Sequence, residues 1–133
     1  MKVSLTVNDA ALNEEMCNQP AAFLFYANEY AKAEKAYEDT RIIVERVEAE
    51  AFTRIRQSLV AQGTKPSNEV VANAVKIDPT YVNAQKVLNK AKSTMQEAKN
   101  LRDAWFMRKD LLIQLAINSR TEMKSLQNTI HEN

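Results

Sequence analysis

A short basic stretch, from Arg54 to Lys65, carries the side chains best suited to binding another molecule. It holds Arg54, Arg56 and Lys65 and contains no Asp or Glu. The helix dipole also favours cations near a helix C-terminus, so a purely structural role is the alternative. Three locally uncompensated cations can, however, hold a phosphate backbone without reading bases, and such binding weakens steeply with salt. We therefore predict a phosphate-binding surface here.

Further cations lie in the last third of the chain. Arg102, Lys109 and Arg120 recur at intervals of seven and eleven residues, so they fall on one side of a helix and could extend the phosphate-binding surface. Arg108 differs, because it lies close to the apolar stripe of the same helix. An unpaired charge there would be costly, so we expect a carboxylate partner and a structural role for Arg108.

Residues for catalysis are nearly absent. His131 is the only histidine and lies close to the end of the sequence, and Cys17 has no basic cluster beside it to lower the pKa of its thiol. A single glycine cannot form a glycine-rich phosphate loop, and the chain has no Glu-x-x-His pair for a di-metal site. We expect no catalytic residue, no metal and no cofactor, and therefore a protein that is not an enzyme.

The net charge of +1 hides an uneven distribution. Residues 1–50 hold five Lys and Arg against ten Asp and Glu, whereas residues 51–133 hold thirteen against seven. The two parts could attract each other between subunits, or both could simply be solvated helix faces. No apolar run approaches the ~20 residues that span a membrane, and the N-terminus does not look like a signal peptide. With one cysteine, we expect a soluble intracellular protein of a reducing cytoplasm.

The elements that position these residues are helices. One glycine and three prolines in 133 residues favour long uninterrupted helices. Asp78-Pro79 is a strong helix start, and the 54 residues that follow contain no glycine or proline. Only Val3–Val7 alternates like a strand or arm. We predict an arm and short helix over 1–19 ended by Pro20, a long helix over 20–62, a connector helix over 67–77 and a long helix over 79–130.

The fold class that these elements predict is all-α. Gly63 should end the first long helix, and Ser67 should start the connector. Val70, Val71, Ala74 and Ile77 give the connector an apolar face. Two long helices joined by a short helical connector should fold back on each other as an antiparallel hairpin.

The segment from Trp105 to Ile117 is apolar most of the way round its helix. A helix that is apolar on all sides must be covered on all sides, and in so short a chain the best cover is another copy. We predict that Trp105, Leu112 and Leu115 build the core, while Phe106, Ile113 and Ile117 contact the next subunit. These six residues form the predicted interface of a homo-oligomer.

Three segments resemble the UvsY-like recombination mediator proteins of bacteriophages. Arg54-Ile55-Arg56 followed by Gly63 is similar to the basic pair of that family, which is implicated in binding single-stranded DNA. Val75-Lys76-Ile77-Asp78-Pro79 resembles the step into its long C-terminal helix. The segment from Trp105 to Leu115 (WFMRKDLLIQL), continuing to Asn118-Ser119-Arg120, is similar to the C-terminal signature of small phage recombination-cluster proteins.

This resemblance implies a ring-like homo-oligomer that functions in DNA recombination and repair in the host cytoplasm. Such a mediator binds single-stranded DNA and the phage single-strand-binding protein, and it loads a RecA-type recombinase without a nucleotide cofactor of its own. The DNA-binding residues would be Arg54, Arg56, Lys65, Arg102, Lys109 and Arg120. The alternative is a coiled-coil structural, adaptor or inhibitor protein of a phage that does not bind DNA.

Overall fold

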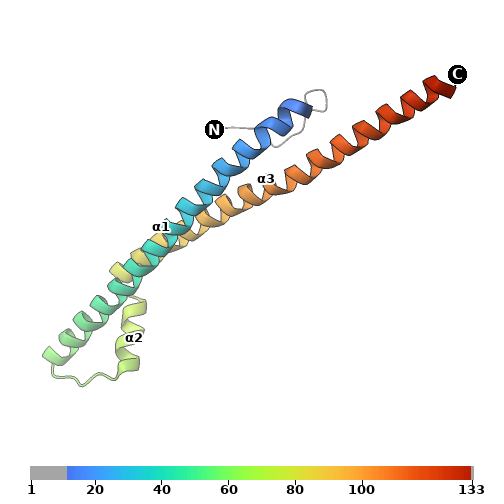
Figure 1. The fold of residues 1–133 in the computed structure, drawn as a ribbon. Helices are drawn as coiled ribbons and strands as arrows, with labels where there is room; N and C mark the ends of the chain where they lie inside the picture. Colours follow the sequence, from blue (N-terminus) through green and yellow to red (C-terminus); the bar gives the residue numbers. More distant parts are fainter. Residues whose placement is uncertain (1–11, 133) are drawn as a thin grey trace. The chain divides into compact units, whose positions relative to one another are not determined.

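The described part of the chain folds into three helices, two of them long. The computed structural model describes residues 12–132, and the side chains of residues 12–130. Helix α1 spans Leu12–Ala61, α2 spans Asn68–Lys76 and α3 spans Pro79–Glu132 (Figure 1). The prediction of an all-α fold is confirmed for the described residues, and the strand-like segment Val3–Val7 lies outside them. None of the described helices has an apolar stretch long enough to cross a membrane.

The end of α1 is set by the glycine that the sequence indicates. Gly63 has a φ of 86°, a left-handed conformation that side chains other than glycine rarely adopt. Its N–H donates to the carbonyl of Val60 at 3.0 Å, and the N–H of Thr64 donates to the carbonyl of Leu59 at 3.1 Å. These two bonds satisfy carbonyls that the last turn would otherwise leave unpaired, so the chain turns here.

The starts of α2 and α3 are also fixed by local side chains. The Ser67 hydroxyl accepts a hydrogen bond from the N–H of Val70 at 3.2 Å, and Ser67 has an extended backbone. The Asp78 carboxylate accepts one from the N–H of Tyr81 at 3.3 Å, with Pro79 as the first residue of α3. Each cap satisfies an otherwise unpaired N–H of a first turn. The predicted starts are therefore confirmed.

The predicted break at Pro20 is wrong. Instead of a short helix ended by Pro20, α1 continues through this proline as one helix of 50 residues. Proline removes one helical hydrogen bond and crowds the carbonyl four residues before it, at a cost of about 3 kcal/mol. Gln19 and Ala22, on either side of Pro20, are both buried against the rest of their unit. This packing stabilises the helical conformation where the local sequence favours a break.

The contacts divide the chain into two compact units. Unit 1 combines Met1–Tyr30 with Glu97–Asn133, and unit 2 is Ala31–Gln96. Each long helix therefore contributes one segment to each unit. The buried apolar residues among those described are Ala22, Trp105 and Leu112 in unit 1, and Val44, Ala51, Val71 and Val75 in unit 2. Each unit thus has a small core of its own.

Helix α2 uses a different face from the predicted one. Val71 and Val75 are buried, whereas Val70 and Ile77 remain 53% and 78% exposed. Residues 71 and 75 lie one turn apart on the same side of the helix, and that side faces the core of unit 2. The prediction that Val70 and Ile77 share the buried face is wrong, because a nine-residue helix rich in apolar residues offers more than one possible face.

Candidate functional site

Arg54 is the more exposed of the two predicted DNA-binding arginines in α1, and its side chain is held in place by the Asp78 carboxylate. Its Nη2 donates a hydrogen bond to Oδ1 of Asp78 at 2.9 Å. The Arg54 side chain is 58% exposed, whereas that of Asp78 is only 8% exposed. Because Asp78 also caps α3, this ion pair joins α1 to the start of α3 inside unit 2. Asp78 therefore holds one nitrogen of the guanidinium, while most of the Arg54 side chain faces solvent.

The ion pair with Arg54 also shifts the titration of Asp78. The hydrogen bond from Arg54 lowers the pKa of the Asp78 carboxyl below its ordinary value of 3.8, and the N–H of Tyr81 acts in the same direction. Burial opposes this shift but is the smaller influence. The charged form of Asp78 is therefore favoured in the folded chain.

The pH dependence of stability should report this ion pair. Because the folded pKa of Asp78 is lowered, its contribution to the free energy of unfolding is present above the unfolded pKa and is lost as the pH falls through the folded pKa. Asp78→Asn keeps an N-cap oxygen but cannot titrate there. We expect urea denaturation between about pH 6 and about pH 3 to show a smaller loss of stability for this variant than for the wild type. Equal losses would contradict a role for this ion pair.

Arg56 lies in a different environment, between α1 and α2. Its Nη2 donates to the side-chain oxygen of Asn68, and its guanidinium lies 5.0 Å from the centre of the Phe52 ring. Its Nε is buried and has no hydrogen-bond partner. Lys65 is exposed in the turn between these helices. Arg56 thus lies partly inside the fold, while Lys65 is exposed to solvent.

The surface around Arg54 is not uniformly basic. Glu50 lies one turn before Arg54 and lines the same shallow hollow. Its carboxylate pairs with Arg46 at 3.8 Å, and both side chains are largely exposed. The acid-free stretch of the sequence therefore begins at Arg54 and runs to the turn at Lys65, and the next acid is the exposed Glu69 in the first turn of α2.

The other three predicted cations belong to α3 and to unit 1. Arg102 donates to its neighbour Asp103 at 3.0 Å, and its guanidinium lies 4.4 Å from the centre of the Tyr30 ring. The ammonium of Lys109 lies 4.6 Å from the centre of the Phe106 ring, and Arg120 is exposed. The six predicted DNA-binding residues are therefore divided, three in each unit.

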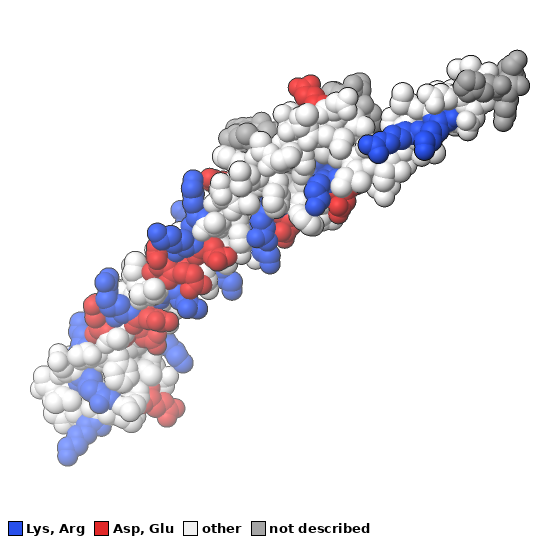
Figure 2. Space-filling view, viewed as in Figure 1, with Lys and Arg blue, Asp and Glu red and all other residues white. Residues whose placement is uncertain are grey.

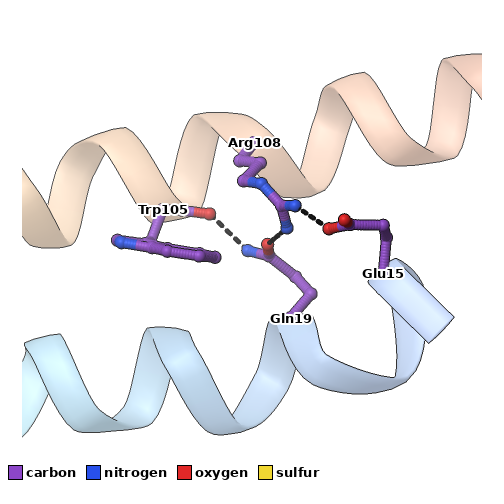
Figure 3. A network of polar contacts seen from close by, with 4 residues as sticks. All are labelled: Glu15, Gln19, Trp105 and Arg108. Atoms are coloured by element: carbon purple, nitrogen blue, oxygen red, sulfur yellow. Dashed lines mark hydrogen bonds and ion pairs between the residues drawn. The ribbon is translucent and has the colours of Figure 1, made fainter. Parts of the chain in front are cut away.

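Arg108 is buried in unit 1, and its predicted carboxylate partner is confirmed. Arg108 is 4% exposed, and its guanidinium pairs with the carboxylate of Glu15 on α1 (Figure 3). It also donates to Oε1 of Gln19 at 2.9 Å, while the side-chain N–H of Gln19 donates to the carbonyl of Trp105. Gln19 thus links two residues of α3. No feature of the sequence indicates this role for Gln19.

Aromatic side chains of unit 1 pack beside the Arg108, Glu15 and Gln19 side chains. Trp105 is fully buried and stacks on Tyr26, with 5.6 Å between ring centres and 13° between ring planes. The Arg108 guanidinium lies 4.8 Å from the centre of the Trp105 ring. The indole Nε1 is buried without a hydrogen-bond partner. Stacking and cation–π contact therefore hold Trp105, rather than a bond to its N–H.

The six predicted interface residues separate into two groups. Trp105 and Leu112 are buried within the single chain, and Leu115 is partly buried. The remaining three form the exposed group, with exposed fractions of 49% for Phe106, 43% for Ile113 and 47% for Ile117. Only the second group presents apolar surface to another molecule.

The remaining titratable candidates form no cluster in the described part of the chain. Cys17 is a free, exposed thiol, and no group of three or more His, Cys, Asp or Glu side chains among the described residues could hold a metal ion. The His131 side chain lies outside the described side chains. In comparisons with known proteins, no family model, curated protein or solved structure matches the chain.

Proposed function

We propose that this chain is a homo-oligomeric protein that binds single-stranded DNA through the α1–α2 turn. The observation that carries the proposal is the anchored, solvent-facing guanidinium of Arg54 at the start of a stretch without acids that extends to Lys65. An arginine whose guanidinium is already hydrogen-bonded through one nitrogen loses little conformational freedom when its other N–H groups bind a phosphate. In this proposal the two long helices form an antiparallel hairpin.

Single strands are favoured over duplexes by the aromatic ring beside the cations. Phe52 is partly exposed and lies beneath the Arg56 guanidinium. Unpaired bases stack on aromatic rings and on arginine planes, whereas the bases of a duplex are already stacked on each other. The Phe52–Arg56 pair would supply such a platform next to the phosphate-binding cations. The role of the chain is then binding and not catalysis.

The biological process follows from the resemblance to phage recombination mediators. A homo-oligomer with several such turns could hold a strand while single-strand-binding protein is displaced and a RecA-type recombinase is loaded. The phage origin, the ring and the two protein partners belong to this proposal.

A double substitution at the turn tests the DNA site. Arg54→Ala with Arg56→Ala should reduce the negative slope of log affinity against log salt for a labelled single strand by about 1.4, which is about 0.7 for each lost phosphate contact. Lys65→Ala, which touches neither helix cap, should reduce it by about 0.7. Fluorescence anisotropy over a salt series measures both slopes, and circular dichroism confirms that each variant is folded.

The matched control removes the same charge elsewhere in unit 2. Lys35→Ala with Arg41→Ala takes two cations from exposed positions of α1, and Arg41 is paired only with Glu38 on its own helix, at 3.2 Å. This control should bind DNA as the wild type does. If both double variants lose affinity equally, the binding is a diffuse effect of net charge. If neither changes, these cations do not form the site.

A second candidate function is a coiled-coil adaptor that binds other proteins and no DNA. The exposed apolar side chains of unit 1, among them Phe106, Met107 and Leu111 at 49%, 69% and 51%, favour it. Contiguous exposed apolar side chains commonly mark protein–protein contacts. A gel-shift with a labelled single strand and an unlabelled duplex competitor separates the two functions, because the adaptor should shift no strand at any salt concentration.

A further inference from the structure

Unit 1 carries an apolar groove of about 660 Å³ between α1 and α3. Met16, Pro20 and Leu24 follow one another at intervals of four on the α1 side, and Phe106 and Ile113 form the α3 side. Leu24 and Ile113 are 60% and 43% exposed, so the walls stand in solvent. On the face drawn in Figure 2, the part formed by the start of α1 is mostly free of charged side chains, whereas the end of α3 carries a group of basic ones. The groove therefore suits an apolar ligand.

The dimensions and charge of the groove limit what fits it. Met16 to Leu24 is eight residues of helix, or about 12 Å at 1.5 Å per residue. Among the described residues that line the groove, the one charged side chain is that of Lys109, which lies over the Phe106 ring. A fitting ligand is a helical segment of about two turns, with an apolar stripe and an acid on one flank.

The far end of α3 is such a segment. The stripe that packs on α1 through Trp105 and Leu112 continues at Ala116 and resumes seven residues later with Met123, Leu126 and Ile130. These three side chains are 60%, 65% and 72% exposed. The described part of α1 begins at Leu12, beside the Leu115–Glu122 part of α3, so no described part of α1 lies over them. We name Met123, Leu126 and Ile130 the terminal stripe.

The terminal stripe cannot enter the groove of its own chain. Ile113 and Met123 belong to one continuous helix and are ten residues, or about 15 Å, apart along it. A helix cannot bend back into a groove that its own earlier turns form. Any stripe that occupies the groove must therefore come from a second copy.

The terminal stripe matches the groove in length and in charge. From Met123 to Ile130 is seven residues, or about 10 Å, against about 12 Å for the groove. Glu122 lies on one flank of the stripe, where it can face Lys109 on the α3 wall. Arg120 and Lys124 lie on the other flank and would face α1, whose first turn holds Glu14 and also Glu15, which already pairs with Arg108. The contact would thus bring opposite charges together on both flanks.

We propose that the groove of one copy binds the terminal stripe of a second copy. The contact is head-to-tail, because each chain offers one groove and one stripe, and a head-to-tail contact closes into a ring when its rotation permits. It rests on the proposed function, since it takes the homo-oligomer as given, but it does not depend on DNA binding.

Two complementary variants test this contact. Leu24→Glu places a charge in the groove wall, and Leu126→Glu places one in the stripe; both positions are more than half exposed in the single chain. Each variant alone should associate at least about thirtyfold more weakly than the wild type, because a charge would be buried in the contact. An equimolar mixture should form a dimer of twice the 15.1 kDa chain mass and nothing larger, since one intact groove meets one intact stripe. Sedimentation velocity measures these species.

The other outcomes contradict the head-to-tail contact. Loss of assembly in only one variant would indicate that grooves pair with grooves or stripes with stripes. If the wild type assembles but the mixture stays monomeric, this contact is overturned, and the proposed oligomer must form through another surface. A wild type that is monomeric at micromolar concentration would overturn both. The salt series with Arg54→Ala and Arg56→Ala tests the DNA site independently.

A charge swap gives a second measurement. Lys109→Glu and Glu122→Lys should each weaken association by up to about fivefold, and the double variant should recover most of this loss. Lys99→Glu, at an exposed position of α3 outside the groove, is the matched control and should associate as the wild type does. If the double variant associates no better than the single ones, Lys109 and Glu122 do not meet.

Discussion

Replacing Trp105 with Ala is expected to lower the free energy of unfolding by about 3–5 kcal/mol. The side chain is fully buried, stacks on Tyr26 and lies beneath the Arg108 guanidinium. Removing it leaves a cavity in unit 1. It also removes the aromatic ring that the buried Arg108 guanidinium contacts. Urea denaturation followed by circular dichroism, at one fixed protein concentration, measures the loss without relying on tryptophan fluorescence.

Two controls define what the Trp105 substitution reports. Trp105→Phe keeps an aromatic ring against Tyr26 and removes an indole N–H that has no partner, so its loss should be clearly smaller than that of Trp105→Ala. Met107→Ala, on the same helix but 69% exposed, should change stability by no more than about 0.5 kcal/mol. If Trp105→Ala unfolds at the same urea concentration as the wild type, Trp105 does not stabilise unit 1.

Replacing Arg108 with Ala is expected to lower the free energy of unfolding by about 3 kcal/mol. The substitution leaves the Glu15 carboxylate and the amide oxygen of Gln19 without their donor. Gln19 is buried, whereas the Glu15 side chain is 22% exposed, so partial hydration of the carboxylate keeps the loss at the lower end of the range. Thermal and urea unfolding at neutral pH measure this loss.

A double-mutant cycle separates the pair from its surroundings. Arg108→Met combined with Glu15→Leu removes both charges, and such replacements of buried pairs are often neutral, so the double variant should be more stable than Arg108→Met alone. Arg102→Ala, whose side chain is 30% exposed and pairs with its neighbour Asp103, should lose less than about 1 kcal/mol. If the double variant loses as much stability as Arg108→Met and Glu15→Leu lose together when measured singly, the Glu15 contact contributes nothing.

The helix ends could be predicted because their chemistry is local. Gly63, Ser67 and Asp78 each act on backbone groups within a few residues, and the C-terminal end of α1 and both ends of α2 and α3 agree with the prediction to within about three residues. Pro20 shows the limit of local reasoning. Its neighbours Gln19 and Ala22 are buried by packing in unit 1, and that packing overrides the preference of the proline to end a helix.

The candidate site could be predicted only in part. The sequence indicated which residues are basic and that Arg108 needs an acid, but not that Arg54 would meet Asp78 or that Arg56 would meet Asn68. It also could not show that Arg102 and Lys109 lie against aromatic rings. These contacts change how much of each cation a phosphate can reach, and they depend on packing between helices.

The sequence by itself determined that this protein is helical, where its helices end, and that the Trp105–Ile117 segment has more apolar surface than one partner helix covers. Hydrogen bonds and caps within a few residues fix the helices and their ends, and the order of the apolar residues along a helix fixes its apolar surface. Only the tertiary structure decided that Arg108 pairs with Glu15, 93 residues away, and that the groove of unit 1 and the terminal stripe both stay open. Contacts between residues so distant in sequence depend on which helix faces pack together. Several helix faces of this chain have a similar apolar pattern, so the sequence alone does not show which of them pack against each other.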